Sequence, residues 1–293
     1  MKKILIAGKD SYVGTSFEKW VSQWPEKYSI STIDTFGDKW HEKNFGDFDT
    51  ILHVAAIVHK KEKAEMEKLY LRVNYELPVK LAQKAKLDGV KQFVFMSTMG
   101  VYGINYGTIT KESIPVPCTL YGKSKLKAER ELQLMEDDNF KITIIRPPMI
   151  YGENCKGNYP RLSKLSQKVP VFPDYNNERS MIYIRNLCEF IRLMIDNEEN
   201  GIFFPQNKTY VNTTLLVREI AETYGKKIHF TKIFNPIIKL LFYHIPVIDK
   251  LFGTFICDKR LSLHDHFNYC ITDFSTSVKE SEGLIIKQYD LFE

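Results

Sequence analysis

The sequence predicts an α/β fold in which a doubly wound parallel sheet carries a smaller C-terminal region. Short apolar runs alternate with helix-like stretches as far as Arg146, and such alternation is typical of parallel strands joined by crossover helices. A glycine-containing turn separates the first run from the first helix. After Arg146 the alternation weakens, and Pro, Asn and aromatic residues become frequent. We therefore expect one domain over residues 1–155, which also uses part of 180–230, and a second region over 156–293.

The expected elements follow from these patterns in chain order. The strands are "KILIAG", "YSISTID", "DTILHVAA", "KQFVFMS" and "KITIIR", and a first helix runs from Tyr12 to about Trp24. Between Glu62 and Lys86, leucine or valine recurs at every fourth position, which predicts a long amphipathic helix. Pro78 lies inside it, so we expect a kink near Asn74. Another helix carries "YGKSK", and "NTTLLVREIAETYG" is typical of a capped helix that ends with glycine.

Composition and charge narrow the class of protein. With 293 residues, 44% of them hydrophobic, the chain can bury a large core. The net charge of +5 is dispersed, so no nucleic-acid partner is expected. The five cysteines lack zinc-ligand spacing, which predicts a reduced, metal-free, cytoplasmic protein.

The apolar stretch that begins at Ile233 is too interrupted for a membrane span. Lys239, Pro246, Asp249 and Lys250 break it, whereas a span needs about 20 consecutive apolar residues. We expect amphipathic helices that pack within a domain there, and peripheral contact with a membrane stays open.

The segment "GKDSYVG" lies between the first strand and the first helix. Glycines at this place permit a tight turn and let the backbone approach a pyrophosphate at a helix N-terminus. The predicted dinucleotide contacts are those of Gly8, Ser11, Tyr12, Val13 and Gly14, with Ser11 in the place of the usual middle glycine. Asp34, at the end of the second strand, is expected to accept hydrogen bonds from a ribose and to repel a 2′-phosphate. Asp34 as a plain turn residue is the alternative.

The segment "YGKSK" places Tyr121 and Lys125 one turn apart on one helix face. A phenol can be held beside an ammonium group there. The pair is also compatible with an ordinary amphipathic helix, and the rest of the chain decides between these interpretations.

Five segments, in this order along the chain, resemble the extended short-chain dehydrogenase/reductase family: "GKDSYVG", "HVAA", "STMGVYG", "YGKSK" and "RPPMIYG". The resemblance covers essentially the whole chain and implies a Rossmann-type sheet that binds NAD(P). In finer detail, "FVFMSTMGVYG" and "NNERSMIYIRNL" resemble the capsular and O-antigen reductases. Those enzymes reduce a UDP-2-acetamido-2,6-dideoxy-4-keto-hexose for surface polysaccharide synthesis.

The resemblance implies a role for each member of a catalytic set. Tyr121 is expected to be the general acid/base, and Lys125, together with the positive charge of the oxidised nicotinamide, is expected to lower its pKa. Lys125 is also expected to hold the nicotinamide ribose. Thr98 corresponds to the hydroxyl that orients the reacting oxygen. Asn74 matches the family's active-site asparagine near the cofactor, or is simply a helix-surface amide.

Further contacts are implied on both sides of the reaction centre. His53 is expected against the cofactor or as a plain strand-end histidine, and the neighbouring cofactor contacts are Val54, Ala55, Ala56, Pro148 and Met149. Substrate contacts are expected from Thr98, Met99, Asn158 and Arg179, the last as a partner of the nucleotide diphosphate. Arg179 as a solvated surface charge is the alternative.

Several functions compete on these residues. A 4,6-dehydratase needs an Asp-Glu pair after Thr98, and Met99 and Gly100 stand there instead. A non-enzymatic NAD(P) sensor has no need of the Tyr/Lys pair. The favoured function is NAD(P)H-dependent reduction of a UDP-4-keto sugar to UDP-N-acetylfucosamine or UDP-N-acetylquinovosamine, and a UDP-hexose 4-epimerase is the alternative. NAD(H) is favoured and NADP(H) is possible, since Lys39 can reach a 2′-phosphate. A homodimer through the helix over 65–86 and the helix of Tyr121 is also implied.

Overall fold

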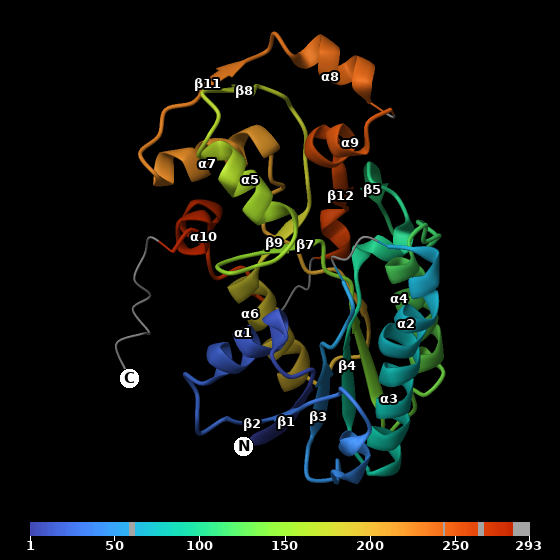
Figure 1. Ribbon diagram of the computed structural model, residues 1–293. Coiled ribbons are helices and arrows are strands. Elements are labelled where there is room, and N and C mark those ends of the chain that lie inside the picture. The colour runs from blue at the N-terminus through green and yellow to red at the C-terminus, as the bar shows by residue number, and fades with distance from the viewer. Residues whose placement is uncertain (59–61, 243, 263–266, 284–293) are drawn as a thin grey trace.

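A computed structural model of the chain describes residues 1–58, 62–242, 244–262 and 267–283. Within them, one parallel sheet has six strands in the order β10-β6-β4-β3-β1-β2 (Figure 1). These strands are β1 (Lys2–Ala7), β2 (Tyr28–Ile33), β3 (Thr50–His53), β4 (Gln92–Met96), β6 (Lys141–Ile145) and β10 (Gly201–Phe203). The predicted parallel sheet is therefore confirmed. From β1 the chain adds β2 on one side and then β3, β4, β6 and β10 on the other, as in a doubly wound fold.

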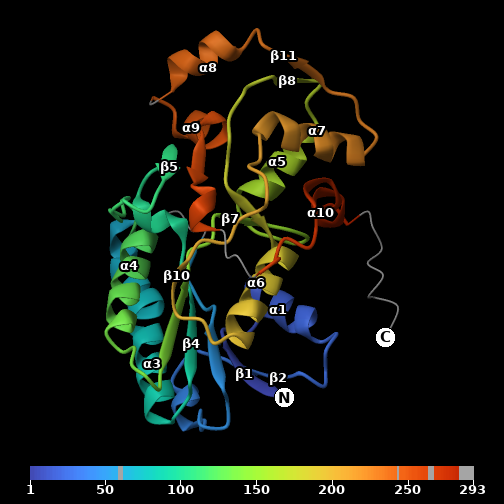
Figure 2. The same ribbon diagram turned by 180° about the vertical axis from the view of Figure 1, so that it is seen from behind.

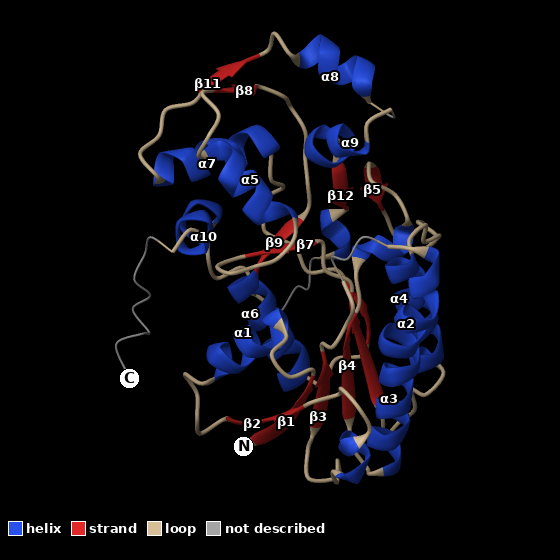
Figure 3. Cartoon of the chain, in the orientation of Figure 1, coloured by secondary structure: helices blue, strands red, loops and turns tan. Residues whose placement is uncertain are grey.

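Helices cover both faces of this sheet. On one face lie α1 (Tyr12–Val21) and α6 (Ile184–Asp196), and on the other lie α2 (Glu67–Leu71), α3 (Leu77–Leu87) and α4 (Leu120–Gln133) (Figure 2). Neighbouring residues of a strand point to opposite faces. Ile4 and Ile6 of β1 accordingly pack in one apolar cluster, and Leu5 and Ala7 pack in the other. The sheet, red in Figure 3, is buried between helices on both sides, which explains its near-continuous apolar strands.

The helix expected over residues 62–86 is interrupted near its middle. A short 3₁₀ turn, η2 (Ala64–Met66), precedes α2, and a π-helical turn, η3 (Arg72–Glu76), joins α2 to α3. Pro78 has no N–H to donate to the carbonyl of Asn74, so the regular ladder cannot continue there. The expected irregularity near Asn74 is thus found as a π turn, which buries the Asn74 side chain completely.

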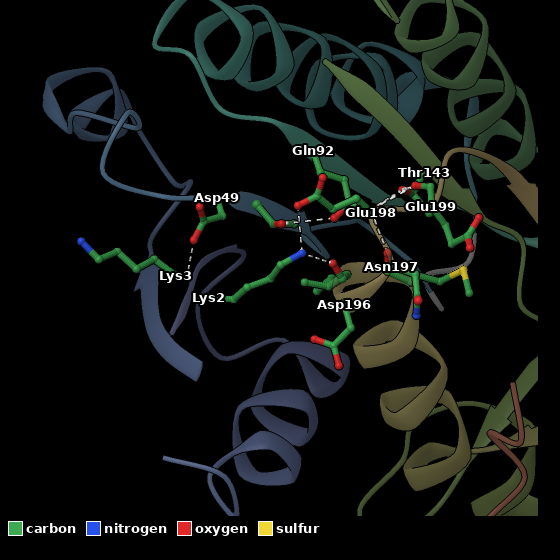
Figure 4. A network of polar contacts seen from close by, with 12 residues as sticks. Lys2, Lys3, Asp49, Gln92, Thr143, Asp196, Asn197, Glu198 and Glu199 are labelled. Atoms are coloured by element: carbon green, nitrogen blue, oxygen red, sulfur yellow. Dashed lines mark hydrogen bonds and ion pairs between the residues drawn. The ribbon is translucent and has the colours of Figure 1, made fainter. Parts of the chain in front are cut away.

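A polar network ties the amino ends of the strands to the end of α6 (Figure 4). The buried amide of Gln92 donates to Thr143 Oγ1 at 2.9 Å and to the carbonyl oxygens of Met194 and Glu199 at 3.0 Å each. Lys2 Nζ donates to the Ile195 carbonyl and to Glu198. These bonds satisfy buried polar groups at the edge of the sheet away from the site described below.

The C-terminal region is built from short elements. Small parallel pairs join β7 (Met149–Tyr151) to β9 (Met181–Tyr183), β8 (Val171–Pro173) to β11 (His229–Thr231), and β5 (Gly107–Ile109) to β12 (Phe255–Cys257). Its helices are α5 (Asn158–Ser166), α7 (Thr213–Thr223), α8 (Asn235–Leu241), α9 (Pro246–Phe252) and α10 (Phe274–Ser281). Because α6 and β10 return to the main sheet, part of 180–230 belongs with the first half of the chain. The exact division into domains stays a prediction. No helix in the described ranges is long and apolar enough to cross a bilayer.

The stretch after Ile233 differs from the expectation of packed amphipathic helices. Its two helices, α8 and α9, are seven residues each. Ile238 is buried in α8, but Ile237 and Leu240 of the same helix are 57% and 75% exposed. The segment is helical, as its apolar pattern predicts, but much of its apolar surface points outward.

Candidate active site

The turn between β1 and α1 has the geometry expected of a nucleotide-binding loop. Gly8 has φ +132°, and a Cβ there would lie 2.7 Å from the backbone nitrogen of Ala55. Ser11 accepts a hydrogen bond from the Gly14 amide at 3.2 Å and so caps α1. A Cβ on Gly14 would lie 2.5 Å from that Ser11 hydroxyl. Ser11 therefore has a structural reason to stand in the place of the usual middle glycine.

Tyr12 and Val13 begin α1 and pack against the apolar cluster of that face. Burial raises the pKa of Tyr12, and its hydroxyl has no hydrogen-bond partner among the described residues. Their backbone amides belong to the first turn of the helix, where a dinucleotide phosphate would bind. Any cofactor contact of these two residues is therefore expected from the backbone.

A small cavity of about 160 Å³ lies beside this turn, between α1 and β2. Gly8, Lys9, Asp10, Gly14 and Thr32 contribute to its lining. Asp34 follows β2 and is exposed, and its Oδ1 accepts from the Phe36 amide at 2.8 Å. Asp34 therefore stabilises the turn after β2. Its exposed carboxylate forms no ion pair within the described residues. These residues fit the ribose end of a dinucleotide.

The loop after β3 packs closely on the end of β1. The amides of Val54 and Ala55 both donate to the carbonyl oxygen of Ala7, at 3.0 and 3.1 Å. Ala56 follows with a half-buried side chain. His53 is fully buried beside the rings of Phe93 and Phe95, and neither of its ring nitrogens has a partner among the described residues. Burial, followed by the charge of Lys125, holds the pKa of His53 well below its ordinary value. His53 is thus buried at the end of β3, and its contact with the cofactor stays a prediction.

Tyr121, Lys125 and Thr98 meet above the carboxyl end of β4. Tyr121 and Lys125 lie one turn apart on the inner face of α4, and Thr98 caps η4 (Met99–Tyr102), its hydroxyl accepting from the Gly100 amide at 3.0 Å. Burial raises the pKa of Tyr121, and a side-chain hydrogen bond with Thr98 opposes that rise. The arrangement brings the three expected catalytic side chains together.

Lys125 is 1% exposed and occupies an unusual environment. Its ammonium group donates to the carbonyl oxygen of Met96 at 2.8 Å and lies 4.4 Å from the centre of the Phe95 ring. Burial lowers the pKa of Lys125 to about 7, and the nearby carboxylate of Glu129 opposes this shift. The lowering of the Tyr121 pKa that the sequence predicts is not seen in the chain alone, because the burial of both groups dominates.

The side chain of Asn74 forms hydrogen bonds with the backbone of the loop after β3. Its side chain accepts from the Ile57 amide at 2.8 Å and donates to the Ile57 carbonyl at 3.1 Å. It also donates to Ser124 Oγ on α4 at 3.3 Å. Asn74 therefore joins the loop after β3 to the helix of Tyr121 and Lys125, and the helix-surface alternative is wrong.

Two acidic residues that sequence reasoning missed hold α4 in place. The carboxylate of Glu62 accepts from the amides of Leu120 and Tyr121, at 2.8 and 3.0 Å, and caps the helix at its N-terminal end. Glu129, one turn after Lys125, forms a buried ion pair with Arg146. Glu129 follows Lys125 by four residues, and this helical spacing could have indicated that the two lie close together. Glu62 lies 58 residues from Leu120, so no local sequence pattern indicates their contact.

The Glu129–Arg146 pair connects α4 to the ends of two strands. Arg146 also donates to the Tyr102 hydroxyl at 2.9 Å, and Ser97 donates to Glu129. Ser97 directly precedes Thr98, and Arg146 directly follows β6. This buried network fixes the distance between the helix of Tyr121 and the segment of Thr98.

Met99 and Pro148 are buried, while Met149 begins β7 with a half-buried side chain. Met99 is 2% exposed and packs in a cluster with Val101 and Tyr102. A substrate contact by the Met99 side chain therefore has no support from its position.

The two residues expected at the diphosphate lie in the C-terminal region. Asn158 is exposed at the start of α5. Arg179 is half-buried, and it donates to the Gly253 carbonyl at 2.9 Å. Burial lowers its pKa to about 10, and no carboxylate in the described part of the chain pairs with it. Next to it, Ser180 donates to Gln206 at 2.6 Å and accepts from the Cys257 amide at 2.8 Å. Ser180 and Gln206 therefore form a buried polar contact directly beside Arg179.

The described residues contain no group of three or more metal-ligating side chains. All five cysteines are free thiols. The side chains gathered beside the β1–α1 turn are a phenol, a hydroxyl and a buried amine.

Comparison with known proteins agrees with this arrangement. The model of the NAD dependent epimerase/dehydratase family matches residues 9–206. A UDP-glucose 4-epimerase of Vibrio cholerae is 30% identical over 292 residues, covering 88% of this chain and 87% of the relative. An N-acetyl-alpha-D-glucosaminyl-diphospho-ditrans,octacis-undecaprenol 4-epimerase of Escherichia coli O157:H7 is 30% identical over 213 residues, covering 70% of this chain and 64% of the relative.

Solved structures share the fold over nearly the whole chain. A UDP-glucuronic acid 4-epimerase from Bacillus cereus in complex with NAD superposes with a TM-score of 0.73 at 17% identity, covering 96% of this chain and 98% of the other. A dTDP-4-dehydrorhamnose reductase from Clostridium acetobutylicum superposes with a TM-score of 0.71 at 18% identity, covering 96% and 99%. At such identities the likeness concerns the fold.

Proposed function

Since the chain belongs to the NAD dependent epimerase/dehydratase family, we propose that it catalyses hydride transfer at C4 of a UDP-sugar and interconverts the two C4 epimers. The observation that carries this proposal is the set of Tyr121, Lys125 and Thr98 above the end of β4. The epimerase takes precedence over the reductase favoured by the sequence motifs, because both 30%-identical relatives named above are 4-epimerases.

Each residue has a distinct part in this reaction. NAD, when bound, supplies the nicotinamide that accepts and returns the hydride. Tyr121 takes the proton of the sugar 4-hydroxyl and later returns it to the same oxygen. Thr98 orients that oxygen, and its hydrogen bond with Tyr121 favours the ionised phenol. Lys125 places a positive charge one turn below Tyr121 and is available to a ribose hydroxyl.

A UDP-4-keto-sugar reductase is the second candidate. Burial raises the pKa of Tyr121 in the chain alone, so the phenol keeps its proton. The protonated form is the one that a reductase needs, because its Tyr121 donates a proton to the alkoxide formed at C4. The resemblance of "FVFMSTMGVYG" and "NNERSMIYIRNL" to 4-keto reductases favours the same candidate.

The substrate and cofactor proposals rest on two charged residues. Arg179 offers a desolvated guanidinium with no carboxylate partner in the described residues, which suits the diphosphate of a UDP-sugar. The exposed carboxylate of Asp34 suits the ribose of NAD and repels a 2′-phosphate, so NAD(H) is preferred over NADP(H). Five free thiols suit a reducing compartment, which supports a cytoplasmic enzyme.

A homodimer through α2, α3 and α4 is proposed as the assembly. Leu69, Val73 and Leu77 keep partly exposed side chains, whereas Leu81 is completely buried. Leu69 and Val73 are therefore available for a partner, whereas Leu77 packs partly against the core cluster that contains Leu81. Light scattering of the purified protein is expected to give the mass of two chains, and Leu69→Glu with Val73→Glu the mass of one.

Redox balance separates the two candidate reactions. The purified protein is incubated with UDP-glucose or UDP-N-acetylglucosamine and NAD, with no reduced cofactor, and the sugar products are identified by NMR. An epimerase forms the C4 epimer with no net change in NADH absorbance. A reductase leaves these sugars unchanged, but consumes one NADH for each UDP-4-keto-6-deoxy-N-acetylglucosamine that it converts.

A further inference from the structure

An exposed apolar surface covers the end of the C-terminal region. Its six residues, which we name the apolar cap, flank and include α8 and the start of α9: Ile233 (78% exposed), Phe234 (39%), Ile237 (57%), Leu240 (75%), Ile245 (39%) and Val247 (61%). Helices of water-facing surfaces normally turn their apolar side inward. Six exposed large apolar residues within fifteen positions indicate a surface that binds an apolar partner.

The sequence segment that contains the apolar cap is rich in lysine. Between Gly225 and Phe252 the sequence has a single acidic residue, Asp249. The same stretch has five exposed lysines: Lys226, Lys227, Lys232, Lys239 and Lys250. Lys239 lies in α8 itself and Lys232 lies three residues before it, so exposed lysines and exposed apolar residues share this segment. This combination is complementary to the interface of an anionic lipid bilayer.

A polar cavity of about 570 Å³ opens next to the apolar cap. Arg218 and Lys232 line it together with the amides of Asn176, Asn212 and Asn235 and the carboxylate of Asp174. Asn235 Oδ1 is buried and has no partner among the described residues. The lining of the cavity therefore contains two cationic residues and one acidic residue beside the apolar cap.

The apolar cap also lies where a flat surface can reach it. Figures 1 and 2 place α8 at the end of the molecule farthest from β1 and β2. A second copy of the chain fits this surface poorly, because a two-fold interface would set the same lysines against each other.

We propose that the apolar cap binds the surface of a bilayer that contains anionic phospholipid, and so holds the enzyme at the membrane. Ile237 and Leu240 enter the boundary between headgroups and acyl chains, and Lys232 and Lys239 contact lipid phosphates. The proposal concerns the place of the enzyme and is independent of which C4 reaction it catalyses.

Co-sedimentation with vesicles tests the proposal. The probes are vesicles of phosphatidylcholine alone and vesicles of phosphatidylcholine with phosphatidylglycerol. The protein is expected to sediment with the anionic vesicles and to be released as salt rises, since salt screens surface charge. The I237S/L240S variant is expected to lose at least about tenfold in partition coefficient. K232Q and K239Q are each expected to lose about fivefold on anionic vesicles.

The matched control is L87S/L134S, which removes two leucines that are 86% and 82% exposed on the other half of the molecule. This variant is expected to bind vesicles as the wild type does. Failure of the wild type to bind anionic vesicles would overturn the proposal, as would undiminished binding by a correctly folded I237S/L240S variant. A loss of dimer mass in light scattering for I237S/L240S, with vesicle binding unchanged, would assign the apolar cap to a second copy instead.

Discussion

The ammonium group of Lys125 donates a 2.8 Å hydrogen bond to the carbonyl oxygen of Met96, at the end of the central strand β4. This bond anchors the helix of Tyr121 to the sheet at the level of Thr98. Because Lys125 is buried and its pKa is lowered to about 7, its charge changes within the range of pH in which enzymes are assayed.

Stability should therefore depend on pH through Lys125. Between pH 7 and 10.5 the unfolded chain holds a proton that the folded chain has released, so the free energy of unfolding rises with pH. The slope is at most about 1.4 kcal/mol per pH unit. Below pH 7 Lys125 holds its proton in both the folded and the unfolded chain. The free energy of unfolding is then lowered by the full cost of burying the ammonium charge. Lys125→Met should remove this rise in urea unfolding experiments, and Lys123→Met, an exposed neighbour on α4, should keep it.

Tyr121→Phe should remove the proton donor while keeping the aromatic ring. General acid/base catalysis contributes about 10²–10⁴-fold, so kcat should fall by that factor. Binding of NAD, followed by fluorescence or calorimetry, should stay close to that of the wild type. A near wild-type kcat for this variant would mean that "YGKSK" is an ordinary helix face.

Asp34→Asn should relax the preference for NAD over NADP. The asparagine oxygen can still accept from the Phe36 amide, so the turn is kept and the negative charge alone is removed. One screened charge contact is worth about 1 kcal/mol, so the ratio of the two dissociation constants should change about fivefold. Asp38→Ala, an exposed carboxylate in the same loop, is the control. If the wild type binds NADP more tightly, the role given to Asp34 is wrong.

Glu129→Gln should destabilise the protein by about 3–5 kcal/mol, because it leaves Arg146 buried without its counter-charge. A double variant, E129M/R146M, should be less destabilised than the single one, since it removes both buried charges. Chemical denaturation of the three proteins measures this. An unaltered stability of Glu129→Gln would mean that the pair does not hold α4 to the sheet.

The strands and the helix of Tyr121 and Lys125 could be predicted because their signals are local. Apolar runs such as Ile4–Ala7 define buried strands by themselves, and the spacing of Tyr121 and Lys125 fixes their shared helix face. Glu62 could not be predicted, because its role exists only when it meets the end of α4. The burial of Met99 depends on the cluster that folds around it. The outward direction of Ile237 and Leu240 depends on the packing of α8, which the same apolar pattern does not determine.

The most direct test of the central claim follows the C4 hydrogen during catalysis in D₂O. Hydride transfer to NAD and back returns the original hydrogen to C4 without exchange with solvent. The purified enzyme with UDP-glucose or UDP-N-acetylglucosamine should therefore give the C4 epimer with protium at C4 in its NMR spectrum. Deuterium at C4 of the product, or no epimer from either sugar, would contradict the proposed 4-epimerase.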